Sequence, residues 1–236
     1  MNELTPTGVL RVGIAFAPNK SALFVTRNAD GTPDGVTVDL GHALAAHIGA
    51  PVAFTVAPNT GVLTDAVEAG TVDVSFMPVD EERKLRIAFG PNYFVVESTY
   101  LASDPSGIRT VAEVDRPGVR VVGIANTTTI RAASRTLTQT TAEPAASIDD
   151  AMARMLSGDA DCFALSHEAF GPYLAALPGS RVVEGGFQNT GIAIAVQKGR
   201  PQALATVTEF LNRAKADGTV RRALDRAGFA SEPVAS

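Results

Sequence analysis

Two copies of the string Gly-x-x-Asp stand between an apolar helix-like run and a short apolar strand-like run in this chain. The first copy, in TDAVEAGTVDVSF, carries Gly70 and Asp73, and the second, in DAMARMLSGDADCFA, carries Gly158 and Asp161. The glycine and the aspartate both recur at an offset of 88 residues, from 70 to 158 and from 73 to 161. A change from helical to strand periodicity at a fixed turn marks one structural unit. Its duplication predicts two similar α/β lobes with a cleft between them.

The composition is that of a folded globular protein. The chain has 236 residues, which is enough for one large domain or two small ones. Hydrophobic residues make up 45% and charged residues 19%, so the chain can build a core and is too weakly charged to be disordered. Trp is absent, so Val, Ala, Leu and Ile must fill that core.

Charge and cysteine usage exclude several classes of partner and cofactor. The net charge is −5 and the Lys and Arg residues form no cluster, so nucleic acid is not an expected partner. Cys162 is the single cysteine, which rules out an intrachain disulfide and any multi-cysteine metal site. His42 and His47 lie five residues apart on an expected helix, one more than the spacing that aligns two metal ligands. We therefore predict no metal and no cofactor.

The chain shows no signal for direct membrane insertion. No apolar run approaches the roughly 20 residues that a membrane-spanning helix needs. Residues 1–8 are polar and lack a basic stretch followed by an apolar one, unlike a secretory signal. The protein is therefore expected to be cytoplasmic if Met1 is the native start, or a mature form with an added Met.

Hydrophobic periodicity predicts alternating strands and helices, and therefore a mostly parallel sheet with helices on both faces. Residues 28–35 are expected to form turns and residues 81–86 a short charged turn. Strands are predicted over 10–16, 52–56, 72–77, 93–102, 119–124, 161–165, 182–183 and 191–196, and helices over 38–48, 61–69, 127–137, 147–156, 168–177, 202–217 and 220–227.

Two of the predicted strands connect the lobes. The long strand over 93–102 is the first crossing, and the strand over 191–196 is the return. Lobe 1 is then residues 1–97 plus 190–236, and lobe 2 is residues 98–189. Two crossings of this kind make a hinge.

Several segments carry a family likeness. They are LRVGI (10–14), PDGVTVDLGHALAAHIG (33–49), DEERKLRIAFGPNY (80–93), VVGIANTTT (121–129) and the two Gly-x-x-Asp strings. In this order the chain resembles the bacterial solute-binding proteins of family 3, which bind substrates for amino-acid ABC importers. The resemblance implies a two-lobed periplasmic-binding-protein type II fold, the Venus flytrap. It also implies a monomer with an ABC permease as partner, and a periplasmic location if a signal peptide has been removed.

The resemblance also implies where the ligand binds, namely at the carboxyl ends of the strands. Arg83 matches the family arginine that holds a ligand carboxylate, and a guanidinium fork suits two carboxylate oxygens. The alternative is a surface arginine in a charged turn. Thr127, Thr128 and Thr129 open a helix at the position of the family's second carboxylate clamp, where free N–H groups attract anions. The alternative there is ordinary helix capping by one of them.

Two departures from the family pattern concern the ligand. The strand before Arg83 ends in Phe76-Met77-Pro78, where family members have hydroxyl side chains, so Phe76 and Pro78 offer apolar surface and one fewer N–H donor. Ser166 stands where the family places an aspartate for the ligand ammonium, and a hydroxyl does not offset a buried charge. Glu97 is the substitute partner that we expect, unless it is an edge glutamate that points to water.

Phe16 ends the first predicted strand and Asn19 follows it, where the family places a stacking aromatic side chain and polar contacts. Core packing is the alternative for Phe16. Together these residues predict a ligand that is a small carboxylate, amino-acid-like or an organic acid, and not an ordinary α-amino acid bound in the family manner.

Three functions remain open at this point. The first is a solute-binding protein for an ABC importer. The second is a cytoplasmic ligand-sensing or orphan binding protein. The third is a lyase like cyclohexadienyl dehydratase, with Glu97, His167 or Glu168 as general acid. No nucleophile elbow or phosphate loop is present, so a binding protein is the main expectation.

Overall fold

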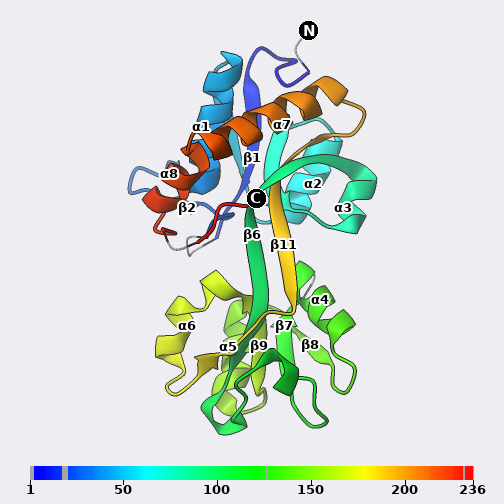
Figure 1. Cartoon of the computed structure of the whole chain (residues 1–236), viewed down its shortest axis with the longest axis vertical. Coiled ribbons are helices and arrows are strands. Elements are labelled where there is room, and N and C mark those ends of the chain that lie inside the picture. Colours follow the sequence, from blue (N-terminus) through cyan, green and yellow to red (C-terminus); the bar gives the residue numbers. More distant parts are fainter. Residues whose placement is uncertain (1–2, 18–20, 126, 231, 236) are drawn as a thin grey trace. The chain divides into compact units, whose positions relative to one another are not determined.

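The computed structural model describes residues 3–17, 21–125, 127–230 and 232–235 of the chain and has mixed α/β architecture (Figure 1). The chain divides into two compact units. Unit 1 comprises Met1–Val95 and Gly191–Ser236, and unit 2 comprises Val96–Thr190. The division falls inside two long strands, β6 (Ile87–Ala102) and β11 (Gln188–Gln197).

Unit 1 contains a sheet in the order β4-β1-β5-β11, in which β4, β1 and β5 are parallel and β11 is antiparallel to β5. Helices α1, α7 and α8 contact one another, and α2 contacts α3, so the helices form two groups (Figure 1). Besides β11 and the first part of β6, its elements are β1 (Leu10–Ala15), β2 (Thr26–Arg27), β3 (Pro33–Asp34), α1 (Val36–Ile48), β4 (Val52–Ala57), α2 (Thr60–Glu68), β5 (Val74–Pro78), α3 (Glu81–Arg86), α7 (Pro201–Ala216) and α8 (Thr219–Arg226).

The core of unit 1 depends on close approach of α2 to the central strand β1. Leu63 and Val67 of α2 are buried with Met77 of β5. A Cβ atom on Gly13 of β1 would lie 2.7 Å from Cδ2 of Leu63, so only glycine permits this packing distance. Apart from Arg11 and Pro78, which are half-buried, every residue of β1 and β5 is buried, as is typical of strands covered by helices on both faces.

Unit 2 contains a sheet in the order β6-β9-β7-β8, in which β7 is parallel to both β9 and β8, and β6 is antiparallel to β9. Strand β10 pairs with β6. Besides the second part of β6, its elements are η1 (Asp104–Ser106), η2 (Val111–Glu113), β7 (Val121–Ile124), α4 (Thr128–Thr136), β8 (Ala142–Ala145), α5 (Ile148–Ser157), β9 (Cys162–Ser166), η3 (His167–Ala169), α6 (Gly171–Ala176) and β10 (Arg181–Val182).

The two Gly-x-x-Asp strings form the same ionic contact in the two units. Asp73 accepts hydrogen bonds from the backbone N–H (2.8 Å), Nε (3.0 Å) and Nη2 (2.6 Å) of Arg11. Asp161 accepts the equivalent three from Arg120, at 2.9, 3.1 and 2.7 Å. Each aspartate N–H in turn donates to the carbonyl of its arginine at 2.8 Å. The repeated aspartate therefore fastens the turn before one strand to the start of its parallel neighbour.

These Arg–Asp clamps lie at the amino-terminal edges of the two sheets, since Asp73 precedes β5 and Asp161 precedes β9. The carboxyl-terminal ends of the strands, where the sequence predicts the ligand, are at the opposite edges. The residues of the Gly-x-x-Asp repeat therefore stabilise the sheets and do not belong to the predicted ligand site.

Some predicted elements differ from the structure. Residues 81–86, expected to be a turn, form helix α3, because the Asp80 side chain caps it by accepting from the N–H of Arg83 at 2.9 Å. Strand β6 begins at residue 87 and not at 93, since it runs through Gly90-Pro91, which resemble a strand break. Strand β8 has the sequence AEPA, which carries no strand signal.

The carboxyl-terminal segment is attached to the unit-1 part of β6. The N–H of Ala235 donates to the carbonyl of Tyr93 at 3.1 Å. Arg221 of α8 donates to the carbonyls of Phe229 and Glu232. The buried Tyr93 hydroxyl donates to the carbonyl of Ala22 at 2.8 Å, and so also holds the loop after β1.

In the part of the chain that the structure describes, no helix is both long and apolar enough to span a membrane.

We predict that Asp73→Asn lowers the free energy of unfolding by about 2 kcal/mol, because hydrogen bonds to a charged group contribute roughly 1.5–3 kcal/mol each and the Asp73 side chain is only 3% exposed. Urea denaturation at pH 7 measures the change. Glu81→Gln, on a carboxylate that is 87% exposed, is the matched control and should change stability by less than about 0.5 kcal/mol. Equal stability of both variants would show that the clamp is dispensable.

The second clamp should make stability depend on pH. Side-chain hydrogen bonds from Arg120 hold the pKa of Asp161 below its ordinary value. The clamp therefore contributes fully above the unfolded-state pKa of about 3.9, and this contribution is lost as the pH falls through the folded-state pKa. In urea denaturation, wild type should exceed Asp161→Asn in stability at pH 7, and the gap should narrow steadily below about pH 4. A gap that is constant with pH would contradict this assignment.

Candidate functional site

Arg83 lies at the carboxyl-terminal edge of the unit-1 sheet, in the helix that follows β5. Its Nη1 donates to the carbonyl of Pro78 at 2.9 Å, and its Nη2 donates to Oγ1 of Thr60 at 2.8 Å. Nη1 is also 3.7 Å from Oδ2 of Asp80. The Arg83 side chain is 14% exposed, against 49% for its neighbour Lys84. Arg83 is therefore a held, half-buried cation, and the alternative of a solvated surface arginine does not apply.

Thr60 is a contact that sequence reasoning missed. It is the first residue of α2 and follows β4, so the parallel strands β4 and β5 bring the starts of α2 and α3 to the same edge of the sheet. The available signal was the sequence Asn59-Thr60 before an apolar helical run, which is a helix start directly after a strand.

The threonines at the start of α4 divide into one capping residue and two others. Thr127 is the N-cap, because its hydroxyl accepts from the N–H of Ile130 at 3.2 Å and donates to the carbonyl of Ile124 at 2.8 Å. The Thr127 hydroxyl therefore caps the helix, which was the alternative to an anion contact. Thr128 and Thr129 are half-buried, and no described residue hydrogen-bonds to their hydroxyls. These two remain the candidate anion contacts of unit 2.

Ser166 ends β9 at the same edge of the unit-2 sheet. Strands β7 and β9 are parallel with Gly123 opposite Ala164, so Ser166 lies beside the segment that leads into Thr128 and Thr129. Ser166 is half-buried, and it pairs with Ser98 of β6. The threonines and the serine that the sequence singles out therefore lie at the same edge of the unit-2 sheet.

Glu97 does not join this group. Ser98 and Ser166 are a cross-strand pair and share a face of the sheet, whereas Glu97, one residue earlier on β6, alternates to the other face. Its side chain is exposed and lies against Gly186, where an added Cβ would meet Oε1 of Glu97 at 2.6 Å. This register counts against Glu97 as a replacement for the family aspartate at position 166.

The aromatic candidates have different surroundings. Phe76 is fully buried and packs edge-on against Tyr93, with ring centroids 5.8 Å apart, so the expected apolar ligand surface is instead part of the core. Phe16 is half-buried at the end of β1, with the guanidinium of Arg27 5.7 Å from its ring centroid. Pro78 is half-buried and supplies a carbonyl to Arg83. Asn19 lies outside the described residues.

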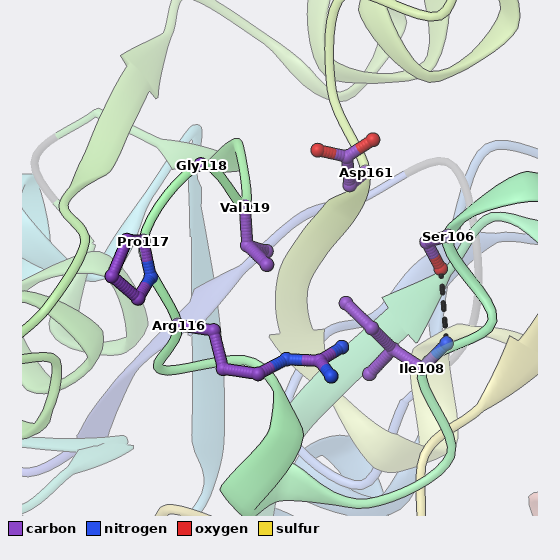
Figure 2. Close-up of a pocket in the computed structure, with 7 residues that line it drawn as sticks. All are labelled: Ser106, Ile108, Arg116, Pro117, Gly118, Val119 and Asp161. Carbon is purple, nitrogen blue, oxygen red and sulfur yellow. Dashed lines mark hydrogen bonds between the residues drawn. The ribbon is translucent and has the colours of Figure 1, made fainter.

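Two cavities of unit 2 lie at the amino-terminal edge of its sheet, around Asp161. The larger has a volume of about 420 Å³, and Figure 2 shows Arg116 extending into it toward Ile108, whose N–H donates to Oγ of Ser106 at 3.3 Å. The smaller, of about 320 Å³, is lined by Arg120 and Asp161 among others. Neither cavity is lined by Thr128, Thr129 or Ser166, so the candidate site does not rest on them.

Several side chains that could act as nucleophiles or metal ligands have packing roles instead. Cys162 is fully buried, and burial raises the pKa of its thiol to about 12, so it is inert at neutral pH. His42 packs on Phe54, and His47 on Phe210. Among residues 3–17, 21–125, 127–230 and 232–235, no three His, Cys, Asp or Glu side chains gather as metal ligands would.

The sequence pattern of the bacterial extracellular solute-binding proteins, family 3, matches residues 12–228, nearly the whole chain. The chain belongs to this family. The fold is accordingly the type II fold of periplasmic binding proteins, as the sequence predicts.

Solved structures of similar proteins agree with this assignment. One is an ancestral amino acid-binding protein described as a precursor of cyclohexadienyl dehydratase; it is 26% identical, with 95% of this chain and 96% of that chain covered and a TM-score of 0.76. Another is a putative binding component of an ABC transporter from Wolinella succinogenes complexed with lysine; it is 24% identical, with 93% and 95% covered and a TM-score of 0.76. The latter likeness shows the fold alone.

One curated relative is a much larger protein. It is the membrane-bound lytic murein transglycosylase F of Maricaulis maris, 41% identical over 68 residues. The match spans 28% of this chain and 15% of that protein.

Proposed function

We propose that this family member captures a small carboxylate-bearing solute at the carboxyl-terminal edges of its two sheets and delivers it to an ABC importer. The single observation that carries the proposal is Arg83, a half-buried guanidinium held by Pro78 and Thr60 at the edge where α/β sheets bind ligands. The description of the family as extracellular supports action outside the cytoplasm. The partner that we propose is an ABC permease.

The chemistry of both edges suits an anion. A guanidinium presents five N–H donors in a planar fork, so one edge can rest on protein acceptors while another binds a carboxylate. In unit 2 the first turn of α4 offers backbone N–H groups and the hydroxyls of Thr128 and Thr129, and helix N-termini favour negative charge.

An α-ammonium group finds less support. Ser166 has a hydroxyl and no charge. The side chain of Glu97 lies on the face of the sheet opposite to that of Ser166. An ammonium that is desolvated without a carboxylate partner is costly. We therefore propose a carboxylate whose recognition needs no α-ammonium, such as a small dicarboxylic or monocarboxylic acid.

Matched pairs of solutes test this proposal by calorimetry: succinate against L-aspartate, glutarate against L-glutamate, and propionate against L-alanine. Within each pair the molecules differ by the α-ammonium group. At least one acid should bind about tenfold or more tightly than its amino-acid partner, because an unpaired buried charge costs more than 1.4 kcal/mol. A preference for the amino acids throughout would overturn the proposed ligand class.

Arg83→Gln should weaken binding of the preferred acid by about 100-fold or more, since truncating one partner of a charge pair costs roughly 2–5 kcal/mol. Arg86→Gln is the matched control, because Arg86 lies on the same helix and pairs at the surface with Asp65 and Glu68. Its binding should equal that of wild type. Equal binding by Arg83→Gln would remove Arg83 from the site. Turnover of prephenate or arogenate would instead point to the lyase.

Ser166→Asp should restore an ammonium partner. We expect the affinity for L-aspartate relative to succinate to rise about tenfold, as one added charge-assisted hydrogen bond allows. Ser166→Asn has almost the same shape without the charge and should leave the ratio unchanged. The same ratio in all three proteins, measured by calorimetry, would show that position 166 does not face the ligand.

A further inference from the structure

Strand β5 ends without the hydroxyl that its family position predicts. Its last residues are Phe76, Met77 and Pro78, of which the first two are fully buried and the third lacks an N–H. The hydroxyl that meets Arg83 comes instead from Thr60, 23 residues earlier in the chain and on a different helix.

The backbone around Thr60 is fixed independently of this hydroxyl. Asn59 caps α2, because its Oδ1 accepts from the N–H of Val62 at 3.0 Å. The carbonyl of Thr60 accepts from the hydroxyl of Thr64 at 2.8 Å. The Thr60 hydroxyl is therefore not needed to start the helix, and its contact within the described chain is with Arg83.

A hydroxyl has one donor hydrogen and two acceptor lone pairs. Since Nη2 of Arg83 donates to Oγ1 of Thr60, the hydroxyl hydrogen is left for an acceptor, and no residue that the structure describes takes it. Thr60 is half-buried, so a solute can reach it. A carboxylate placed on Nη2 of Arg83 could offer one of its oxygens to this hydrogen, because Oγ1 and Nη2 are only 2.8 Å apart.

We propose that Thr60 is a positioning and specificity residue of the carboxylate site, which replaces the hydroxyl missing from the end of β5. It holds the Arg83 guanidinium in one orientation and donates its own hydrogen to the carboxylate that Arg83 binds. The role of Thr60 as a donor to the carboxylate rests on the proposed function. Its role in orienting Arg83 can be tested without any solute.

The first experiment follows the Arg83 guanidinium by NMR in solute-free protein with ¹⁵N-labelled arginine, assigned with Arg83→Lys. In wild type and Thr60→Ser, which keeps the hydroxyl, the Nη signals of Arg83 should be resolved, because hydrogen bonds slow rotation about the C–N bonds. In Thr60→Val, which has the same shape without the hydroxyl, they should broaden or merge. Thr71→Val, at the other end of α2, is the control and should resemble wild type. Resolved Nη signals in Thr60→Val would overturn the positioning role.

The second experiment titrates sodium acetate, the simplest carboxylate probe, against sodium chloride at equal ionic strength, and reads the Arg83 Nε–H signal. Thr60→Val should raise the acetate dissociation constant about tenfold, as loss of one hydrogen bond to a charged group predicts. Thr60→Ser and Thr71→Val should stay within about threefold of wild type. In an Arg83→Lys background, followed by backbone amide signals, Thr60→Val should have a smaller effect, since the two residues act together.

The outcomes separate the two proposals. Acetate binding that is equal in wild type and Thr60→Val overturns the role of Thr60 and leaves carboxylate binding by Arg83 standing. No response of Arg83 to acetate in wild type overturns the carboxylate site and with it the donor role of Thr60. A Thr60→Ser variant as weak as Thr60→Val would show that shape, and not the hydroxyl, matters at this position.

Discussion

The Arg–Asp clamp is the interaction on which the arrangement of both sheets depends. In each unit one carboxylate accepts a backbone N–H and two guanidinium N–H groups from an arginine at the start of the neighbouring parallel strand. This contact fixes the register of β1 against β5 and of β7 against β9, because a shift by one residue would break all three bonds and reverse the buried faces. Because the clamps fix the amino-terminal edge of each sheet, the side chains at the carboxyl-terminal edge can differ without loss of strand register.

That carboxyl-terminal edge holds the side chains of the proposed site. Arg83 is held by groups from three places: the end of β5, the start of α2 and the cap of α3. In unit 2, β7 and β9 are parallel, so Ser166 at the end of β9 and the start of α4 lie at the same edge of the sheet. Strands position these side chains, and the helix starts that follow them supply donors of the kind that the proposed anion site requires.

The sequence predicted the fold well because its periodicity and its duplicated turn are local signals. The clamp partners Arg11 and Arg120 could not be found that way, since each lies dozens of residues from its aspartate. Thr60 was missed for the same reason, because it lies 23 residues from Arg83 in the sequence. Phe76 was expected to face the ligand, but its ring is buried in the core. Helix α3 was not predicted, because a six-residue charged segment has almost no apolar pattern. The N-cap Asp80 is the one local signal for this helix. Side-chain direction, as for Glu97 against Ser166, needs strand register that sequence alone does not provide.

Tyr93 joins three stretches of chain that are far apart in sequence. Its hydroxyl holds the loop after β1 at Ala22, its carbonyl holds the tail at Ala235, and its own strand continues into unit 2. A purification tag or surface-immobilisation anchor fused to the carboxyl end would therefore act on β6 through the hydrogen bond from Ala235 to Tyr93. For measurements of binding, the amino end is the better point of attachment, because it leaves that strand undisturbed.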